Sequence, residues 1–84
     1  MTNKEILKKK IIYRSEHRGN KEMDILLGTF VKKYINQFND SELHDLEKLL
    51  MVEDEILSEW YFDKTDSKSV PNNRISKMLK EYKI

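Results

Sequence analysis

The amino-acid sequence predicts an all-α protein, a compact bundle of about five helices. Two observations support this fold class. Apolar residues recur three and four positions apart along most of the chain, and no stretch alternates apolar and polar residues for long enough to indicate a strand. Residues that favour helix N-termini also precede several of the apolar segments. With 84 residues, the chain has room for one domain, residues 1–84, with one small core.

The first helix is expected from about Asn3 to His17. Thr2 and Glu5 have the spacing of a capping box, in which each side chain accepts a hydrogen bond from the other residue's backbone. A narrow apolar stripe runs along this helix (Ile6, Leu7, Ile11, Ile12 and Tyr13). Gly19 is placed to end the helix, because glycine readily adopts the left-handed conformation of a C-cap.

The second helix has the most regular apolar stripe of the sequence and is expected at the centre of the core. Asn20 can cap its N-terminus. Its stripe consists of Met23, Leu26, Leu27, Phe30, Val31, Tyr34, Ile35 and Phe38. Gly28 costs such a helix about 1 kcal/mol relative to alanine, which favours close approach of a neighbouring helix at this position.

Three further helices are expected after residue 38. Asn39 and Glu42 form a second capping-box pattern, which opens a third helix through roughly Met51. A short fourth helix contains Ile56, Leu57, Trp60 and Tyr61. Of the aromatic residues at its end, Trp60 is expected in the core, whereas Tyr61 or Phe62 is expected to be partly exposed.

The C-terminal part is predicted to consist of a polar linker and a last helix. Residues 62–70 form the linker, and its segment 63–70 offers no apolar content to bury. Pro71 suits the first turn of the last helix, in the tail 71–84. The apolar residues of that helix share one face (Ile75, Met78, Leu79 and Tyr82).

Charge is strongly segregated along the chain, although the formal net charge is only +1. Residues 1–21 have seven basic and two acidic side chains, and residues 39–66 have ten acidic and two basic ones. Such a distribution favours docking to a complementary protein over binding to a polyanion. The alternative function is a nucleic-acid-binding or generic adaptor domain that uses the basic first helix, with Lys8, Lys9, Lys10 and Arg14 against phosphates.

Several functional classes find no support in the sequence. The chain has no cysteine, and His17 and His44 are far apart, so neither a disulfide framework nor a recognisable metal motif is present. Two glycines cannot build a phosphate-binding loop, and no serine stands in a nucleophile-elbow context. No apolar run approaches the roughly 20 residues of a membrane span, and the N-terminus has no secretory h-region. We therefore expect a soluble, cytoplasmic monomer that is no enzyme; the family resemblance described below would place it in the mitochondrial matrix if the source is a eukaryote.

The stretch YRSEHRGNKEMD, residues 13–24, allows two interpretations. From helix electrostatics alone, Arg18 is a favourable cation at a helix C-terminus, and Glu22 is a favourable anion at a helix N-terminus. However, residues 13–62 resemble the small succinate dehydrogenase assembly factors that promote flavinylation. The features of this resemblance are an Arg-Gly-x-x-Glu motif (Arg18, Gly19, Glu22), the acidic Asp24 after it, an apolar helix, an acidic capping box and a late tryptophan.

The resemblance implies a five-helix bundle that binds the flavoprotein subunit of succinate dehydrogenase, or of the related fumarate reductase. It further implies covalent attachment of FAD to a histidine of that subunit, with the cofactor held by the partner and none by this chain. We expect the factor to hold the flavoprotein in a competent conformation, without binding nucleic acid or membrane. The partner-binding residues are then Arg14, Arg18, Gly19, Glu22 and Asp24.

Overall fold

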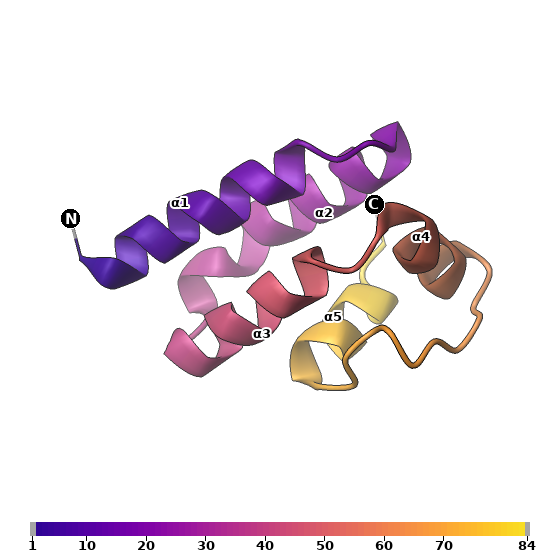
Figure 1. Ribbon diagram of the computed structural model, residues 1–84. Coiled ribbons are helices and arrows are strands. Elements are labelled where there is room, and N and C mark those ends of the chain that lie inside the picture. Colours follow the sequence, from indigo (N-terminus) through magenta and orange to yellow (C-terminus); the bar gives the residue numbers. More distant parts are fainter. Residues whose placement is uncertain (1, 84) are drawn as a thin grey trace.

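The computed structural model describes residues 2–83 and confirms the all-α prediction (Figure 1). Its five α-helices are α1 (Asn3–Glu16), α2 (Lys21–Tyr34), α3 (Asp40–Leu50), α4 (Asp54–Phe62) and α5 (Arg74–Glu81). A short 3₁₀ helix, η1 (Ile35–Gln37), follows α2 directly. The part of the chain described here contains no strand.

The helices α1 and α2 lie side by side and antiparallel, and α3 packs against α1 (Figure 1). The helix α5 packs against α3, and α4 lies near the end of the bundle where α1 turns into α2. A Cβ atom added to Gly28 would lie 3.8 Å from Cγ of Glu16 and 3.9 Å from the carbonyl oxygen of Ser15. Gly28 of α2 thus lies against the end of α1, as predicted, but at distances that would also accommodate a Cβ atom.

One contiguous apolar core joins all five helices. Five α2 residues are buried in it, and Phe30, Leu26 and Leu27 have no exposed surface. Trp60 of α4 is buried, as predicted. Tyr61 is also buried, and its hydroxyl donates a hydrogen bond to the backbone carbonyl of Tyr82, whereas Phe62 is 43% exposed. The prediction that one of these two aromatic residues faces solvent is therefore confirmed.

Three of the predicted helix caps are present. The side chain of Thr2 accepts a hydrogen bond from the backbone of Glu5 at the start of α1. The side-chain oxygen of Asn20 accepts from two backbone N–H groups in the first turn of α2. Asn39 and Glu42 form a complete capping box at the start of α3. These bonds satisfy donors that a helix N-terminus otherwise leaves without partners.

Two predictions about the N-terminal half are wrong in detail. The second helix ends at Tyr34, not at Phe38, because the chain tightens into η1 and the Asn39 cap then starts α3. Phe38 has extended backbone angles and nevertheless stays buried. In α1, Ile6 and Tyr13 are 50% and 62% exposed, so they do not belong to the buried stripe.

Two predictions about the C-terminal half are also wrong. The linker does bury an apolar side chain, since Val70 is only 6% exposed. Pro71 lies before the last helix and not in its first turn. The helix α5 begins at Arg74, because Asn73 and Ser76 form a capping box that fixes its start further along the chain.

Three ion pairs join the basic N-terminal segment to the acidic segment 39–66. They are Lys4–Asp40, Lys10–Glu47 and Arg18–Asp54. In the first two pairs the lysine side chain is about half exposed and the N···O distances are 3.7 and 3.9 Å, so these pairs contribute little stability. The segregation of charge along the chain is thus partly compensated in space, because α1 lies against α3.

Candidate functional site

The connection from α1 to α2, residues 17–22 including the first two residues of α2, contains the Arg-Gly-x-x-Glu motif and is called the RG turn below. The helix α1 ends at Glu16, and His17 follows as its C-cap. The backbone N–H of Arg18 donates a hydrogen bond to Oδ1 of Asp24, which lies in the first turn of α2. The RG turn is thereby tied to the helix that it introduces.

The guanidinium of Arg18 points into the junction between α3 and α4. Its Nε donates to Oδ1 of Asp54 at 2.6 Å, and its two terminal nitrogens donate to the backbone carbonyls of Leu50 and Val52. The last carbonyls of a helix lack partners within the helix and form its negative end, which explains why a cation is favourable there. The side chain of Arg18 is only 10% exposed.

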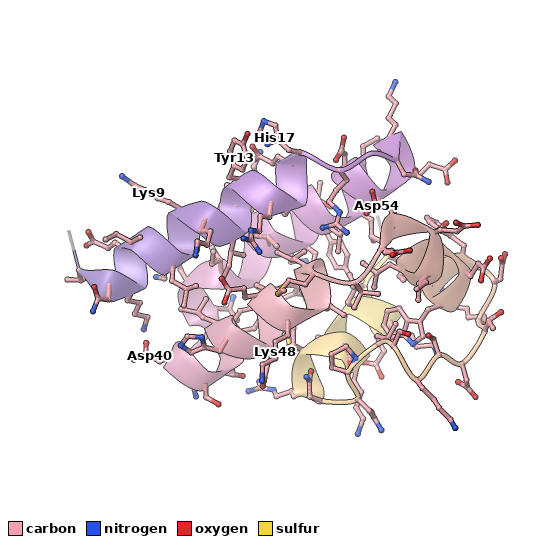
Figure 2. All side chains as sticks on the ribbon, in the orientation of Figure 1. Lys9, Tyr13, His17, Asp40, Lys48 and Asp54 are labelled. Carbon is pink, nitrogen blue, oxygen red and sulfur yellow. The ribbon has the colours of Figure 1, made fainter. Side chains whose placement is uncertain are left out.

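The second carboxylate oxygen of Asp54 accepts a hydrogen bond from the backbone N–H of Gly19 at 2.8 Å. Asp54 is the first residue of α4, where the helix dipole favours an anion (Figure 2). One carboxylate therefore holds the side chain of Arg18 and the backbone of the next residue. The RG turn is fixed by contacts from α2, from the connection between α3 and α4, and from α4.

Gly19 does not adopt the conformation predicted for it. No glycine among residues 2–83 has a positive φ, so Gly19 is not a left-handed C-cap. The side chain of His17 acts at this helix end instead: its Nδ1 donates to the carbonyl oxygen of Tyr13 at 2.8 Å, and the two rings stack at 3.9 Å (Figure 2). A Cβ atom on Gly19 would lie 3.6 Å from Oδ2 of Asp54, which is an ordinary contact distance.

The five residues predicted to bind a partner divide into two groups. Arg18, Gly19 and Asp24 are brought together by hydrogen bonds. Glu22 and Arg14 lie exposed on the surface. Arg14 and Arg18 do not share one helix face, because α1 ends before Arg18 and the Arg18 side chain turns inward.

Sequence reasoning missed Asp54 as a residue of this site. It lies in the segment VEDE, which appears in the sequence only as a break in the apolar rhythm. A carboxylate at a helix start is a common feature, so the local signal could indicate the helix but not the contact with Arg18, 36 positions earlier.

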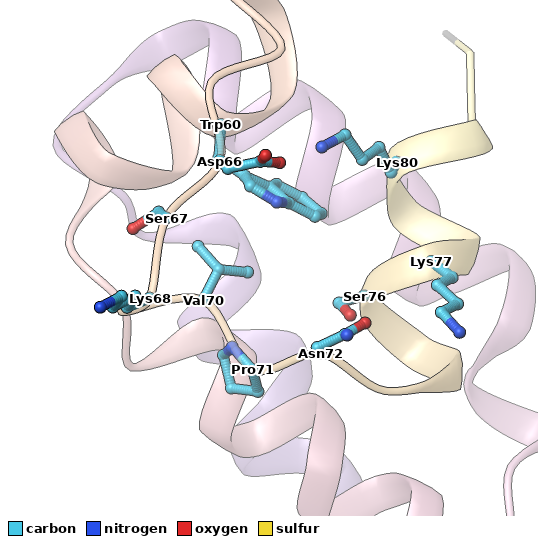
Figure 3. A pocket seen from close by; sticks show the side chains of 10 residues that line it. All are labelled: Trp60, Asp66, Ser67, Lys68, Val70, Pro71, Asn72, Ser76, Lys77 and Lys80. Carbon is cyan, nitrogen blue, oxygen red and sulfur yellow. The ribbon is translucent and has the colours of Figure 1, made fainter.

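A hollow of about 430 Å³ lies at a different place, between the connection 63–73 and α5 (Figure 3). No residue of the RG turn lines it. Trp60 forms part of its wall. The ammonium nitrogen of Lys80 lies over the Trp60 ring, 4.9 Å from the ring centroid. The aromatic surface in this hollow is therefore already covered by a cation of the same chain.

The described residues, 2–83, contain no group of three or more His, Asp and Glu side chains that could hold a metal ion. Within the same range, no helix is both long enough and apolar enough for a membrane span. What the structure offers is a small helical bundle with one exposed turn braced from several elements, which is a type of surface suited to contact with another macromolecule.

Comparison with known proteins shows which family this bundle belongs to. Residues 9–83 match the family described as "flavinator of succinate dehydrogenase". The chain belongs to this family, which confirms the resemblance found in the sequence. Its assignment rests on nearly the whole chain and not on the short motif alone.

The names of curated relatives support the same family assignment. The chain is 37% identical over 81 residues to "succinate dehydrogenase assembly factor 2, mitochondrial" of Scheffersomyces stipitis, covering 92% of this chain and 54% of the relative. It is 35% identical over 83 residues to assembly factor 2-A of Drosophila willistoni, covering 93% and 51%. "FAD assembly factor SdhE" of Acetobacter pasteurianus is 32% identical over 73 residues, covering 87% and 64%.

The chain spans about half the length of the curated mitochondrial relatives described above. No solved structure matches it significantly.

Proposed function

We propose that this protein binds the flavoprotein subunit of succinate dehydrogenase and promotes its covalent FAD attachment. Membership of the flavinator family and the names of the relatives support this proposal. The structural observation that supports it best is the RG turn, where Gly19 and Glu22 of the motif are exposed and the backbone is held by Asp24 of α2 and Asp54 of α4.

In this proposal the protein acts by conformational selection and is not itself an enzyme. A flavoprotein samples several relative orientations of its domains, and a rigid binder shifts the population toward the orientation that it binds best. An orientation that keeps the acceptor histidine close to the flavin raises the effective concentration of the reacting groups. The partner holds the FAD, and this chain needs no cofactor of its own.

The residues of the RG turn have different roles in this proposal. Glu22 provides an exposed acceptor for the partner, and Gly19 allows the partner's surface to approach the backbone closely. Arg18 and Asp24 shape the turn from within, because their polar groups already bond to other parts of the chain. Arg14 adds a positive charge to the exposed surface of α1 before the turn.

The proposal is tested by reconstitution. Apo-flavoprotein of succinate dehydrogenase and FAD are incubated with and without this protein, and flavin that remains bound after denaturation is followed by its fluorescence in a gel. We expect faster and more complete covalent flavinylation with the protein, and co-elution of the two proteins in gel filtration. Equal flavinylation with and without it, together with no complex, would overturn the proposal. The fumarate reductase flavoprotein in parallel distinguishes the two partners.

A further inference from the structure

We propose that Asp54 is a positioning residue for partner binding, which acts by holding the backbone of the RG turn in its binding conformation. This inference rests on the proposed function and assigns a role to a residue outside the Arg-Gly-x-x-Glu motif. Asp54 lies 35 positions after Gly19, yet its two carboxylate oxygens bond to two consecutive residues of the turn.

Two carboxylates, Asp24 and Asp54, hold the backbone of the RG turn. The backbone N–H of Arg18 donates to Asp24, and the backbone N–H of Gly19 donates to Asp54. Two successive N–H groups are thus held by acids from different helices. This arrangement fixes the path of the chain just before Asn20 caps α2, and hence the direction in which the exposed first turn of α2 presents Glu22.

Asp54 lies on the inner side of an exposed turn. Gly19 is exposed, whereas the side chain of Asp54 is 22% exposed and lies against the guanidinium of Arg18. A partner that docks on the outer surface of the turn would meet Gly19 and Glu22, with Asp54 behind them. Because a surface that is already ordered loses less conformational entropy on binding, a braced turn binds more tightly than a mobile one.

Amide hydrogen exchange in the wild-type protein gives the first test. Gly19 lies outside any helical hydrogen-bond ladder, so its N–H owes its protection to Asp54. We expect the Gly19 amide to exchange more slowly than that of exposed Asp66 in the connection between α4 and α5. A Gly19 amide that exchanges as fast as an unstructured peptide would overturn the proposal, whether or not any variant folds.

The variant Asp54→Asn gives the second test, with binding to the flavoprotein measured by calorimetry and corrected for the folded fraction. We expect binding weaker by about tenfold or more, a loss of Gly19 protection, and no such loss in the control Glu42→Gln. Glu42 forms an ion pair of the same length, 2.6 Å, with Arg74 and lies outside the RG turn. Wild-type affinity in folded Asp54→Asn would contradict the role of Asp54 and leave the proposed function standing.

A double-mutant cycle separates positioning from a general loss of stability. If Asp54 acts through the turn that presents Glu22, then Asp54→Asn should weaken binding less in a Glu22→Gln background than in the wild type. Fully additive effects would contradict the proposal. Failure of the wild-type protein to bind the flavoprotein at all would overturn the proposed function, and this inference with it.

Discussion

The two longest irregular connections of the bundle are both polar in sequence, but they are held in different ways. The RG turn is fixed by hydrogen bonds to Asp24 of α2, to Asp54 of α4 and to the carbonyl of Val52 between α3 and α4. The connection 63–73 between α4 and α5 is anchored mainly by one buried apolar side chain, Val70, and most of its other residues are exposed. The RG turn, which contains the Arg-Gly-x-x-Glu motif, is therefore held by partly buried charged groups, whereas the connection 63–73 is held by an apolar contact.

The largest effect on stability is expected from Arg18→Gln. This change removes a cation that bonds to Asp54 and to two carbonyls, and it leaves Asp54 without its partner. Breaking such a pair costs about 3 kcal/mol of unfolding free energy. Urea denaturation followed by circular dichroism measures it.

The matched control is Arg74→Gln. Arg74 bonds to Glu42 at the same 2.6 Å, but its side chain is 75% exposed, so we expect a loss below about 1 kcal/mol. Equal losses at the two positions would show that the RG turn is no better braced than the surface.

A smaller effect is expected from Val70→Ala in the other connection. Two buried methyl groups are lost from a side chain that is 6% exposed, at a cost of about 1–2 kcal/mol. The same denaturation assay measures it, with exposed Ser69→Ala as the control. A loss at Val70 larger than that at Arg18 would reverse the order of the two connections.

Gly19→Ala should leave stability nearly unchanged, within about 0.5 kcal/mol of the wild type. The backbone of Gly19 is not left-handed, and an added Cβ would meet Asp54 only at an ordinary distance. If the partner approaches this backbone closely, the same variant should bind the flavoprotein more weakly despite its normal fold. A strongly destabilised Gly19→Ala protein would contradict the geometry described here.

The smallest expected effect concerns nucleic acid. Lys10 pairs with Glu47, and Lys8 donates to Asn36, so part of the basic first helix already faces groups of the same chain. We expect no salt-dependent shift of duplex DNA or RNA at physiological ionic strength. Submicromolar binding with a steep salt dependence would favour the alternative function that the basic helix suggested.

The sequence predicted the helices better than the contacts between them. Capping patterns at Asn20 and Asn39 correctly located the starts of α2 and α3, because a cap is a local feature of three or four residues. The start of α5 was predicted too early because Pro71 and Asn73 are both typical of helix starts, and Asn73 is the actual cap. The burial of Val70 was not predicted because this residue is a single apolar side chain in a polar segment.

The functional site was predicted only in part, for a related physical reason. The motif could be found from residues close together in sequence, but the burial of Arg18 and the role of Asp54 depend on how α3 and α4 meet the turn. Such long-range pairing leaves no periodic signal in a single sequence. Likewise, Gly19 was expected in a left-handed cap, whereas the ring of His17 bonds to a carbonyl in the last turn of α1.

The central claim, that the RG turn contacts the partner, is tested most directly with Glu22→Gln in the flavinylation assay. Glu22 is exposed and lies in the first turn of α2, so loss of its charge should cost at most about 1 kcal/mol of stability. If its carboxylate becomes buried against the flavoprotein, the change should cost about 2–5 kcal/mol of binding and abolish support of flavinylation. The control is Glu5→Gln, an exposed first-turn carboxylate at the opposite end of α1, which should remain fully active. Wild-type flavinylation with folded Glu22→Gln would contradict the claim.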